Sequence, residues 1–234
     1  PAPRQLEETL QRLPAPPAAV SLTSPDYLGG MGEIAALSQV CHRFGTLLAV
    51  DNAHGAYLRF LSPSLHPLDL GADLCCDSAH KTLPVLTGGA YLHIAKTAPA
   101  SLAENGKTAL ALFGSTSPSY LTLCSLDQCN RYLAEGYPAR LQETAAQLEA
   151  LRAQLRQAGW QVEESDPLRV TLRAVEGLSG QALAQRLRQG GVECEYADQD
   201  FLVLMATPEN TREDFERVLA ALGETRLPPS PLPC

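Results

Sequence analysis

The apolar run that ends at Val50 is the feature that most restricts the fold. In TLLAVDNAHG, residues 46–55, the four residues before Asp51 are all apolar, and the chain then turns polar. Successive side chains of a strand point to opposite faces of a sheet, so a strand without polar residues is buried on both faces. Such strands are typical of parallel sheets that are covered by helices. The run therefore predicts a central strand of a layered α/β structure.

Strands and helices alternate around this run. PAAVSLTS (17–24) predicts a strand that ends in the turn SPDYLGG, and ADLCCDS and GGAYLHI (88–94) predict two more. Apolar residues recur every three or four positions from Ile34 to Phe44, which predicts a helix that Gly45 stops. Residues 1–137 therefore form, by prediction, a large α/β domain with a mostly parallel sheet.

A second, smaller α/β domain is predicted for residues 138–226. A long helix carries an apolar stripe and ends at Gly159; the stripe consists of Leu141, Ala145, Leu148, Leu151 and Leu155. RVTLRAV predicts a strand, SGQALAQRLRQGG a helix, and VECEYADQDFLVLMAT a strand pair that turns at 198–199. A last helix is predicted to start at Asn210, with Glu213 completing a capping-box-like pattern. Residues 227–234, LPPSPLPC, hold four prolines and are predicted to be disordered.

Composition excludes several classes of function. The formal net charge of -8 disfavours binding to a phosphate backbone, so nucleic acid is not an expected partner. No stretch approaches the ~18 consecutive apolar residues of a membrane span, and the first residues lack the pattern of a signal peptide, so a cytoplasmic protein is the default expectation. The seven cysteines form no C-x-x-C pair and are interpreted as reduced thiols. Cys75 and Cys76 are strand neighbours, so their side chains are predicted to point to opposite faces.

Polar side chains follow three of the predicted strands. They are Ser24, Asp26 and Tyr27 after the first strand, Asp51 and His54 after the second, and Ser78, His80 and Lys81 after the third. Because ligands of open α/β sheets bind beyond the carboxyl ends of the strands, these groups are expected to converge on one edge.

Each of these groups also has a simpler interpretation. A lone lysine after a strand is most often a solvated loop residue, and Asp51 could cap a turn. Asp51, His54 and His80 could instead supply three ligands to a metal ion. Taken one by one, none of these residues identifies a function.

Taken together, the motifs resemble those of the Orn/Lys/Arg decarboxylase family, which has the aspartate-aminotransferase fold (fold type I) and depends on pyridoxal 5'-phosphate (PLP). The resemblance rests on VDNAHGAY (50–57) and DSAHKTLPVLTGGAYLH (77–93), and continues through TSPDYLGG (23–30), GSTSPSYLTLCSLDQCNRYL (114–133) and VECEYADQDFLVLMATPENTREDFERVL (192–219). It implies that Lys81 holds the cofactor as a Schiff base and that Asp51 is the partner of the pyridine nitrogen. An amine is needed to condense with the cofactor aldehyde, and a carboxylate keeps the ring nitrogen protonated.

The same resemblance implies supporting roles for other residues. His54 and His80 would contact the ring or position a proton near Lys81, Ala53 would lie against the ring face, and Ser78 would bind the cofactor phosphate. Ser115 and Thr116 lie in a segment that reaches the phosphate of the neighbouring subunit in this fold, which implies a homodimer with a shared active site. No metal is expected.

Two departures from the family pattern bear on specificity. Asn52 stands where relatives usually carry an acidic residue, and Tyr57 stands where many carry a histidine. The resemblance also implies that several strands and a phosphate-binding turn precede the strand at 17–24 in a complete enzyme. The chain is therefore expected to be the C-terminal part of such an enzyme, lacking part of the cofactor site.

The leading functional hypothesis is decarboxylation of a basic amino acid, namely arginine, lysine or ornithine. An aminotransferase or lyase using PLP is the nearest alternative, and it would need an arginine such as Arg169 or Arg173 to clamp the substrate carboxylate. A truncated, non-catalytic paralogue that pairs with another subunit is the third hypothesis. A metal hydrolase is the weakest one, because it leaves Lys81 without a role.

Overall fold

The computed structural model describes residues 2–114, 117–175 and 177–223, in two compact units. Unit 1 contains the chain up to Tyr27 and Met31–Pro138, and unit 2 contains Leu28–Gly30 and the chain from Ala139 onward. Ser115, Thr116 and the predicted disordered tail at 227–234 lie outside the described residues. None of the helices in the described ranges is long and apolar enough to cross a lipid bilayer.

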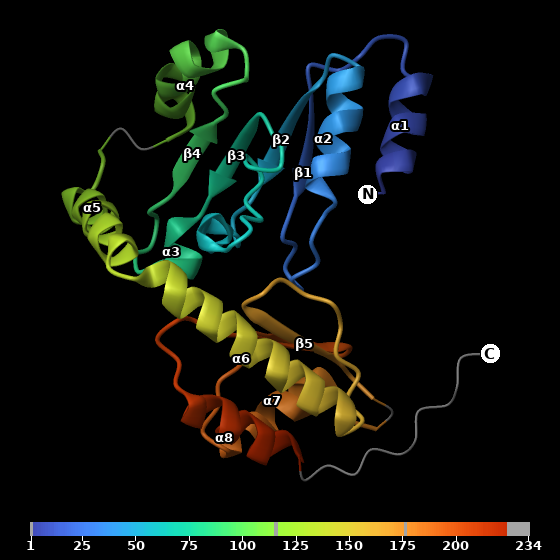
Figure 1. Cartoon of the computed structure of the whole chain (residues 1–234), viewed down its shortest axis with the longest axis vertical. Helices are drawn as coiled ribbons and strands as arrows, with labels where there is room; N and C mark the ends of the chain where they lie inside the picture. The colour runs from blue at the N-terminus through green and yellow to red at the C-terminus, as the bar shows by residue number, and fades with distance from the viewer. Residues whose placement is uncertain (1, 115–116, 176, 224–234) are drawn as a thin grey trace. The chain divides into compact units, whose positions relative to one another are not determined.

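Unit 1 is built on one sheet of four strands in the order β1-β2-β3-β4 (Figure 1). The strands are β1 Ala19–Thr23, β2 Leu47–Asp51, β3 Leu74–Asp77 and β4 Tyr91–Ile94. The first three are parallel, with Thr23 opposite Asp51 and Asp51 opposite Cys76. β4 runs antiparallel to β3, so that Asp77 faces Tyr91. The predicted α/β class with a mostly parallel sheet is confirmed.

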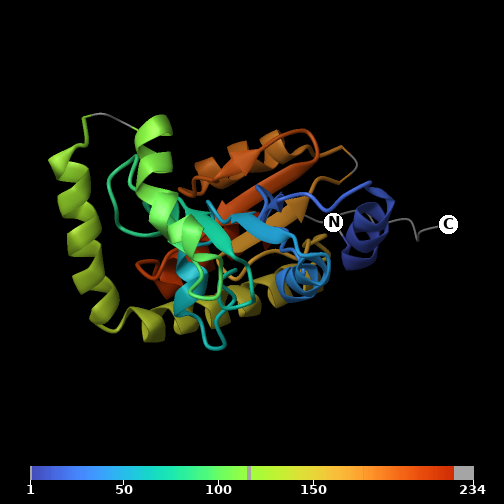
Figure 2. The same ribbon diagram turned by 90° about the horizontal axis from the view of Figure 1, so that it is seen from above.

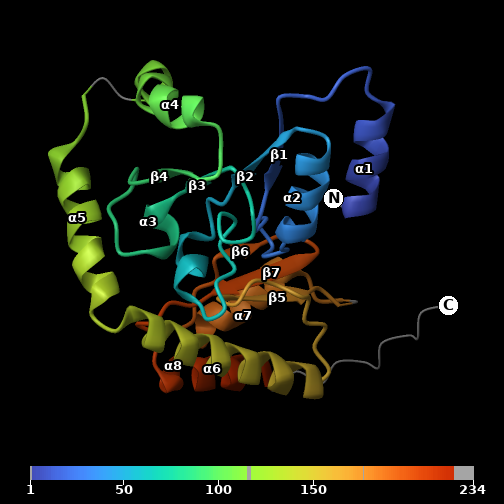
Figure 3. The ribbon, with the colours of Figure 1, turned by 45° about the horizontal axis from the view of Figure 1, so that its top comes forward.

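The helices of unit 1 pack mainly where their apolar residues recur with helical spacing. In α2, the predicted positions Ile34, Leu37, Val40 and Cys41 are all buried in one core with Leu48 and Val50 of β2. α1 packs against α2 through Leu6 and Leu10 (Figure 3). The helical segments are α1 Pro3–Arg12, α2 Ile34–Arg43, η1 Ala56–Phe60, α3 Ala79–Thr82, α4 Ala100–Phe113 and α5 Tyr120–Ala134. The sequence pattern did not predict α4, none of whose residues is buried and whose large apolar side chains Leu110, Leu112 and Phe113 are exposed near its C-terminal end.

Unit 2 contains an antiparallel sheet in the order β5-β7-β6, with α7 packed against β7 (Figure 2). Its elements are α6 Tyr137–Gln157, which starts at the end of unit 1, β5 Arg169–Arg173, α7 Gly180–Gln189, β6 Tyr196–Ala197, β7 Phe201–Met205 and α8 Arg212–Gly223. The leucines of the predicted stripe on α6 are buried. Asp198 accepts hydrogen bonds from the N–H groups of Asp200 and Phe201, which explains the tight turn between β6 and β7.

Residues 28–30 complete unit 2 although they lie far away in sequence. The Thr171 hydroxyl donates to the Leu28 carbonyl (2.6 Å), and the Asp166 N–H donates to the Gly29 carbonyl (2.8 Å). Gly29 has φ +92°, and a Cβ there would lie 2.7 Å from Cβ of Ser165, so only glycine fits this close approach.

The start of the last helix differs from the prediction. α8 begins at Arg212, and Asp214 rather than Glu213 accepts from the N–H and hydroxyl of Thr211, at 2.9 and 3.2 Å. Asn210 instead accepts from the Thr207 N–H at 2.8 Å, in the preceding turn. The predicted capping pair of Asn210 and Glu213 was wrong, because Thr211 and Asp214 offer the same spacing one residue later.

The adjacent cysteines of β3 lie in different environments, as predicted: Cys75 is buried and Cys76 is exposed. Burial raises the pKa of both thiols, far more for Cys75, whose ionisation the Asp77 carboxylate also opposes. We expect a thiol reagent to label Cys76 at least about a hundredfold faster than Cys75, which reacts only when the strand opens. Mass spectrometry of Cys75→Ser and Cys76→Ser variants measures this directly. Equal rates at the two positions would contradict the register of β3.

Candidate active site

The carboxyl ends of β1, β2 and β3 lie at one edge of the unit 1 sheet. Backbone pairing continues one residue past the strand ends: the Ser24 N–H donates to the Asp51 carbonyl (3.0 Å), and the Asn52 N–H donates to the Cys76 carbonyl (2.9 Å). Three short turns with polar side chains are therefore held side by side. This is the arrangement in which α/β proteins place their ligands.

Lys81 and His54 meet at this edge. Lys81 Nζ lies 3.2 Å from His54 Nε2, although the two residues come from different turns. Lys81 sits on α3, directly after β3, and is exposed, whereas His54 is buried. The Tyr27 ring meets the His54 ring edge-on, with centroids 5.4 Å apart. An amine in contact with an imidazole nitrogen can exchange a proton with it, so the pair suits acid–base chemistry at Nζ.

Asp51 ends β2 with an exposed carboxylate, which accepts the Ala53 N–H at 3.1 Å. The turn then closes tightly, because the Gly55 N–H donates to the Asn52 carbonyl at 2.8 Å. A Cβ at Gly55 would lie 2.0 Å from Asn52 Oδ1, so a larger residue here would displace the Asn52 side chain. The DNAHG sequence thus holds Asp51, Ala53 and His54 in one compact turn.

Ser78 and His80 lie on the turn that carries Lys81. Ser78 precedes α3, and its carbonyl accepts the Lys81 N–H at 3.0 Å; its hydroxyl does not cap the helix. His80 is half-buried, and its N–H donates to the Gly89 carbonyl at 3.1 Å. Within the part of the chain that the structure describes, Asp51, His54 and His80 do not form a cluster that could share a metal ion.

A network around Asp77 was missed by the sequence analysis. Asp77 Oδ1 accepts from Asn52 Nδ2 (2.7 Å), while Oδ2 lies 3.1 Å from His66 Nε2 and 3.2 Å from His93 Nε2. Burial alone would raise the pKa of Asp77, but hydrogen bonds from His66, His93 and Asn52 outweigh it and hold this pKa well below its usual range. The position of Asp77 in the sequence was an available signal, because side chains two residues apart in a strand lie on the same face and Asp77 therefore shares the face of the buried Cys75. The histidines gave none, since the antiparallel course of β4 brings His93 to this place.

A family model described as "Orn/Lys/Arg decarboxylase, major domain" matches residues 3–175. The chain belongs to this family. The predicted family is thereby confirmed, and Lys81, His54 and Asp51 all lie in the matched part of this decarboxylase-family chain.

Two bacterial proteins illustrate the similarity in sequence. The uncharacterized protein YaaO of Bacillus subtilis (strain 168) is 28% identical over 229 residues, which cover 94% of this chain and 47% of YaaO. An arginine decarboxylase of the same organism is 27% identical over 236 residues, covering 94% of this chain and 48% of that enzyme. The chain spans about half the length of these relatives.

Solved structures agree on the fold. The Francisella novicida lysine decarboxylase LdcF superposes with a TM-score of 0.74 at 16% identity, over 95% of this chain and 38% of LdcF. The Sphingomonas wittichii serine palmitoyltransferase gives a TM-score of 0.78 at 18% identity, over 95% and 58%. The predicted fold, that of PLP-dependent transferases of type I, is confirmed.

The two arginines that were considered as carboxylate clamps are both engaged with acidic partners. Arg169 is buried, and its guanidinium forms an ion pair with the buried Asp166. Arg173 is half-exposed, pairs with Glu163 at 2.6 Å and lies over the Phe201 ring, 4.9 Å from its centroid. A substrate carboxylate would have to compete with these partners.

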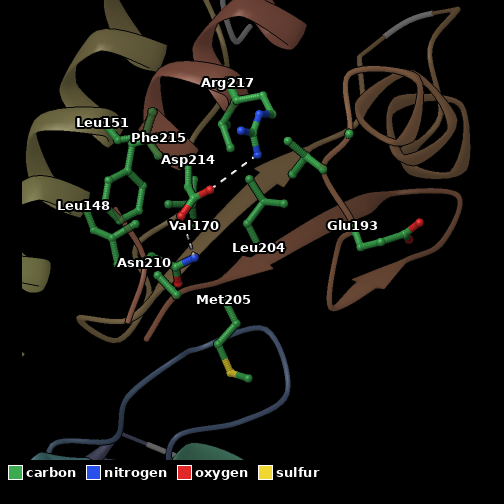
Figure 4. A pocket seen from close by; sticks show the side chains of 14 residues that line it. Leu148, Leu151, Val170, Glu193, Leu204, Met205, Asn210, Asp214, Phe215 and Arg217 are labelled. Carbon is green, nitrogen blue, oxygen red and sulfur yellow. Dashed lines mark hydrogen bonds and ion pairs between the residues drawn. The ribbon is translucent and has the colours of Figure 1, made fainter. Parts of the chain in front are cut away.

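Unit 2 also holds a cavity of about 190 Å³ (Figure 4). Leu148, Leu151, Val170, Leu204 and Phe215 supply its apolar walls, and Asn210, Asp214 and Arg217 lie at its polar side. Asp214 is linked to both polar neighbours, at 3.4 Å each. None of the residues predicted for the active site lines this cavity, so we do not assign the chemistry to it.

Proposed function

We propose that this decarboxylase-family chain carries the lysine-bearing part of a PLP site and serves in the decarboxylation of a basic amino acid, namely arginine, lysine or ornithine. The observation that carries the proposal is the 3.2 Å contact between Lys81 Nζ and His54 Nε2, at the sheet edge where Asp51 also ends its strand. The family match and the naming of relatives as arginine decarboxylases support it. A cytoplasmic location and a homodimer, with Ser115 and Thr116 serving the neighbouring subunit, belong to the same proposal.

The donor set fits PLP. An exposed amine, a carboxylate at the end of a strand and a buried imidazole are the groups that a pyridine aldehyde with an ionisable ring nitrogen needs. The bound cofactor would supply an electron sink for the electron pair that stays at the substrate α-carbon when carbon dioxide leaves.

Each residue has a defined task in this proposal. Lys81 Nζ would hold the cofactor through its aldehyde carbon, and His54 would hold or move a proton at Nζ. Asp51 would keep the proton on the ring nitrogen. Ala53 would lie against the ring face, Ser78 would bind the phosphate, and His80 would contact the ring or position a proton near Lys81.

The test is borohydride trapping of PLP on the purified chain, followed by peptide mapping. The chain has only three lysines, Lys81, Lys96 and Lys107, so the map is simple. We expect a pyridoxyl group on Lys81, lost in Lys81→Ala and retained in the control variant Lys96→Arg/Lys107→Arg. Equal labelling of all three lysines in the wild-type chain would refute the assignment.

A second experiment, on unreduced protein, tests the reaction itself. The wild-type chain is incubated with PLP and arginine, lysine or ornithine, and carbon dioxide, amine and keto acid are measured. Carbon dioxide with the matching amine supports decarboxylation, whereas a keto acid product would support the aminotransferase alternative.

A further inference from the structure

Three side chains of unit 1 converge at a cavity that Lys81 does not line. His66 lies between η1 and β3, Asp77 ends β3, and His93 lies on β4. Nε2 of His66, Nε2 of His93 and a carboxylate oxygen of Asp77 all lie within 4.8 Å of one another. We propose that these three residues bind a divalent transition metal ion of the Zn²⁺ class. The proposal does not depend on PLP or on the reaction proposed above.

The ligand types suit such an ion. Two imidazoles and one carboxylate form the protein ligand set of many zinc and non-haem iron sites. The Asp77 Oδ2 to Nε2 distances are 3.1 Å for His66 and 3.2 Å for His93. Two ligands of a tetrahedral ion with bonds of ~2.0–2.1 Å are separated by roughly 3.3 Å, so an ion fits with small side-chain shifts.

The surrounding contacts already orient the ligands. Asn52 Nδ2 donates to Asp77 Oδ1 at 2.7 Å, which leaves Oδ2 directed at both imidazoles. The Leu68 N–H lies 3.4 Å from Nδ1 of His66, a contact that suits the ion-free ring with its proton on Nε2 and would be given up when Nε2 binds an ion. Without an ion, the imidazole N–H groups hydrogen-bond to Oδ2; an ion would take the place of these hydrogens on Nε2.

The site has an entrance. A cavity of about 330 Å³ is lined by His66, Asp77 and His93 together with apolar residues such as Phe60 and Leu133. The side chains of His66 and Asp77 are each 4% exposed, while that of His93 is 37% exposed. An ion bound to the three ligands would therefore keep a coordination position facing the cavity, as in open zinc sites.

The chain offers a matched control. His42 Nε2 lies 2.9 Å from Asp73 Oδ2, so this pair repeats the histidine–carboxylate contact. Among the described residues, no third ligand completes it. If a histidine–carboxylate pair alone were enough to bind the ion, the two places would behave alike.

The test is calorimetric titration of the full chain with Zn²⁺, in a background where the exposed Cys76 and Cys124 are replaced by serine. We expect one ion per chain. Loss of a direct ligand in His93→Gln should weaken binding by more than the roughly 10–100-fold that loss of an outer partner costs, and His42→Gln should leave binding unchanged.

Circular dichroism checks that each variant is folded, and Asp77→Asn provides a second variant that retains the side-chain shape. Both ligand variants should also lose the Zn²⁺-dependent rise in melting temperature that the background chain shows. The proposal is overturned if His93→Gln binds Zn²⁺ as tightly as the background chain, if His42→Gln removes the binding, or if the background chain binds no Zn²⁺ at millimolar concentration.

Discussion

Replacing Asp166 by alanine is expected to lower the free energy of unfolding of unit 2 by about 3–5 kcal/mol, because it leaves the Arg169 guanidinium buried without its carboxylate partner. Asp166 is 0% and Arg169 1% exposed. The carboxylate also accepts the Leu168 N–H at 3.0 Å, so the turn before β5 loses a second contact. Trp160 is the single tryptophan, is buried and lies in unit 2, so its fluorescence during urea unfolding reports on this unit.

Two further variants separate charge burial from a general loss of packing. Asp166→Ala combined with Arg169→Met removes both charges and should recover most of the lost stability, since apolar replacements of a buried pair are often neutral. Glu163→Ala breaks the half-exposed pair with Arg173 and should cost less than about 1 kcal/mol. A cost of Asp166→Ala no greater than that of Glu163→Ala would contradict the predicted role of the buried pair.

Replacing Asn52 by aspartate is expected to destabilise unit 1 by about 2–4 kcal/mol at pH 8. Asn52 is 0% exposed, and its Nδ2 donates to Asp77 Oδ1 at 2.7 Å, so the new carboxylate would face a buried carboxylate. One of the two would need a raised pKa to share a proton. A carboxyl whose pKa is higher in the folded than in the unfolded state binds a proton more readily in the folded state, so folding becomes more favourable as the pH falls. The cost of the substitution should therefore shrink between pH 8 and pH 5.5.

The cost of Asn52→Asp is measured by the rate at which a thiol reagent labels the buried Cys75, because labelling requires this part of unit 1 to open. Asn105→Asp introduces the same chemical change at an exposed position of α4 and should stay within about 0.5 kcal/mol of the parent. A cost for Asn52→Asp that is the same at pH 5.5 and pH 8 would show that the two carboxylates are not in contact.

The sequence was informative wherever local pattern and global packing agree. The α2 spacing correctly predicted a helix packed on the core, and the motif at 77–81 led to the confirmed family. The apolar run before Asp51 correctly predicted a strand inside the parallel sheet, but only one of its faces is buried, through Leu48 and Val50, while Leu47 and Ala49 are half-buried. These signals are short-range, because the burial of one face repeats within a few residues.

What could not be predicted depends on contacts between distant segments. The antiparallel turn of β4 sets Asp77 opposite Tyr91 and so brings His93 to Asp77, yet an apolar run has the same pattern in either direction. The 3.2 Å contact of Lys81 with His54 likewise depends on how two turns are packed. The roles assigned to Asp51, Ala53, Ser78 and His80 remain predictions, and trapping of the cofactor is the first step in testing them.

The contribution of residues 28–30 to unit 2 makes this unit discontinuous in sequence. The Thr171–Leu28 hydrogen bond joins residues 143 positions apart, so its formation closes a very long loop. The strand that bears Thr171 can gain this contact only after the intervening chain has been brought together, which favours late completion of unit 2 during folding. A polypeptide cut at Ala139 would lack three residues of its own domain, and the Asp166 N–H would lose its acceptor, the Gly29 carbonyl.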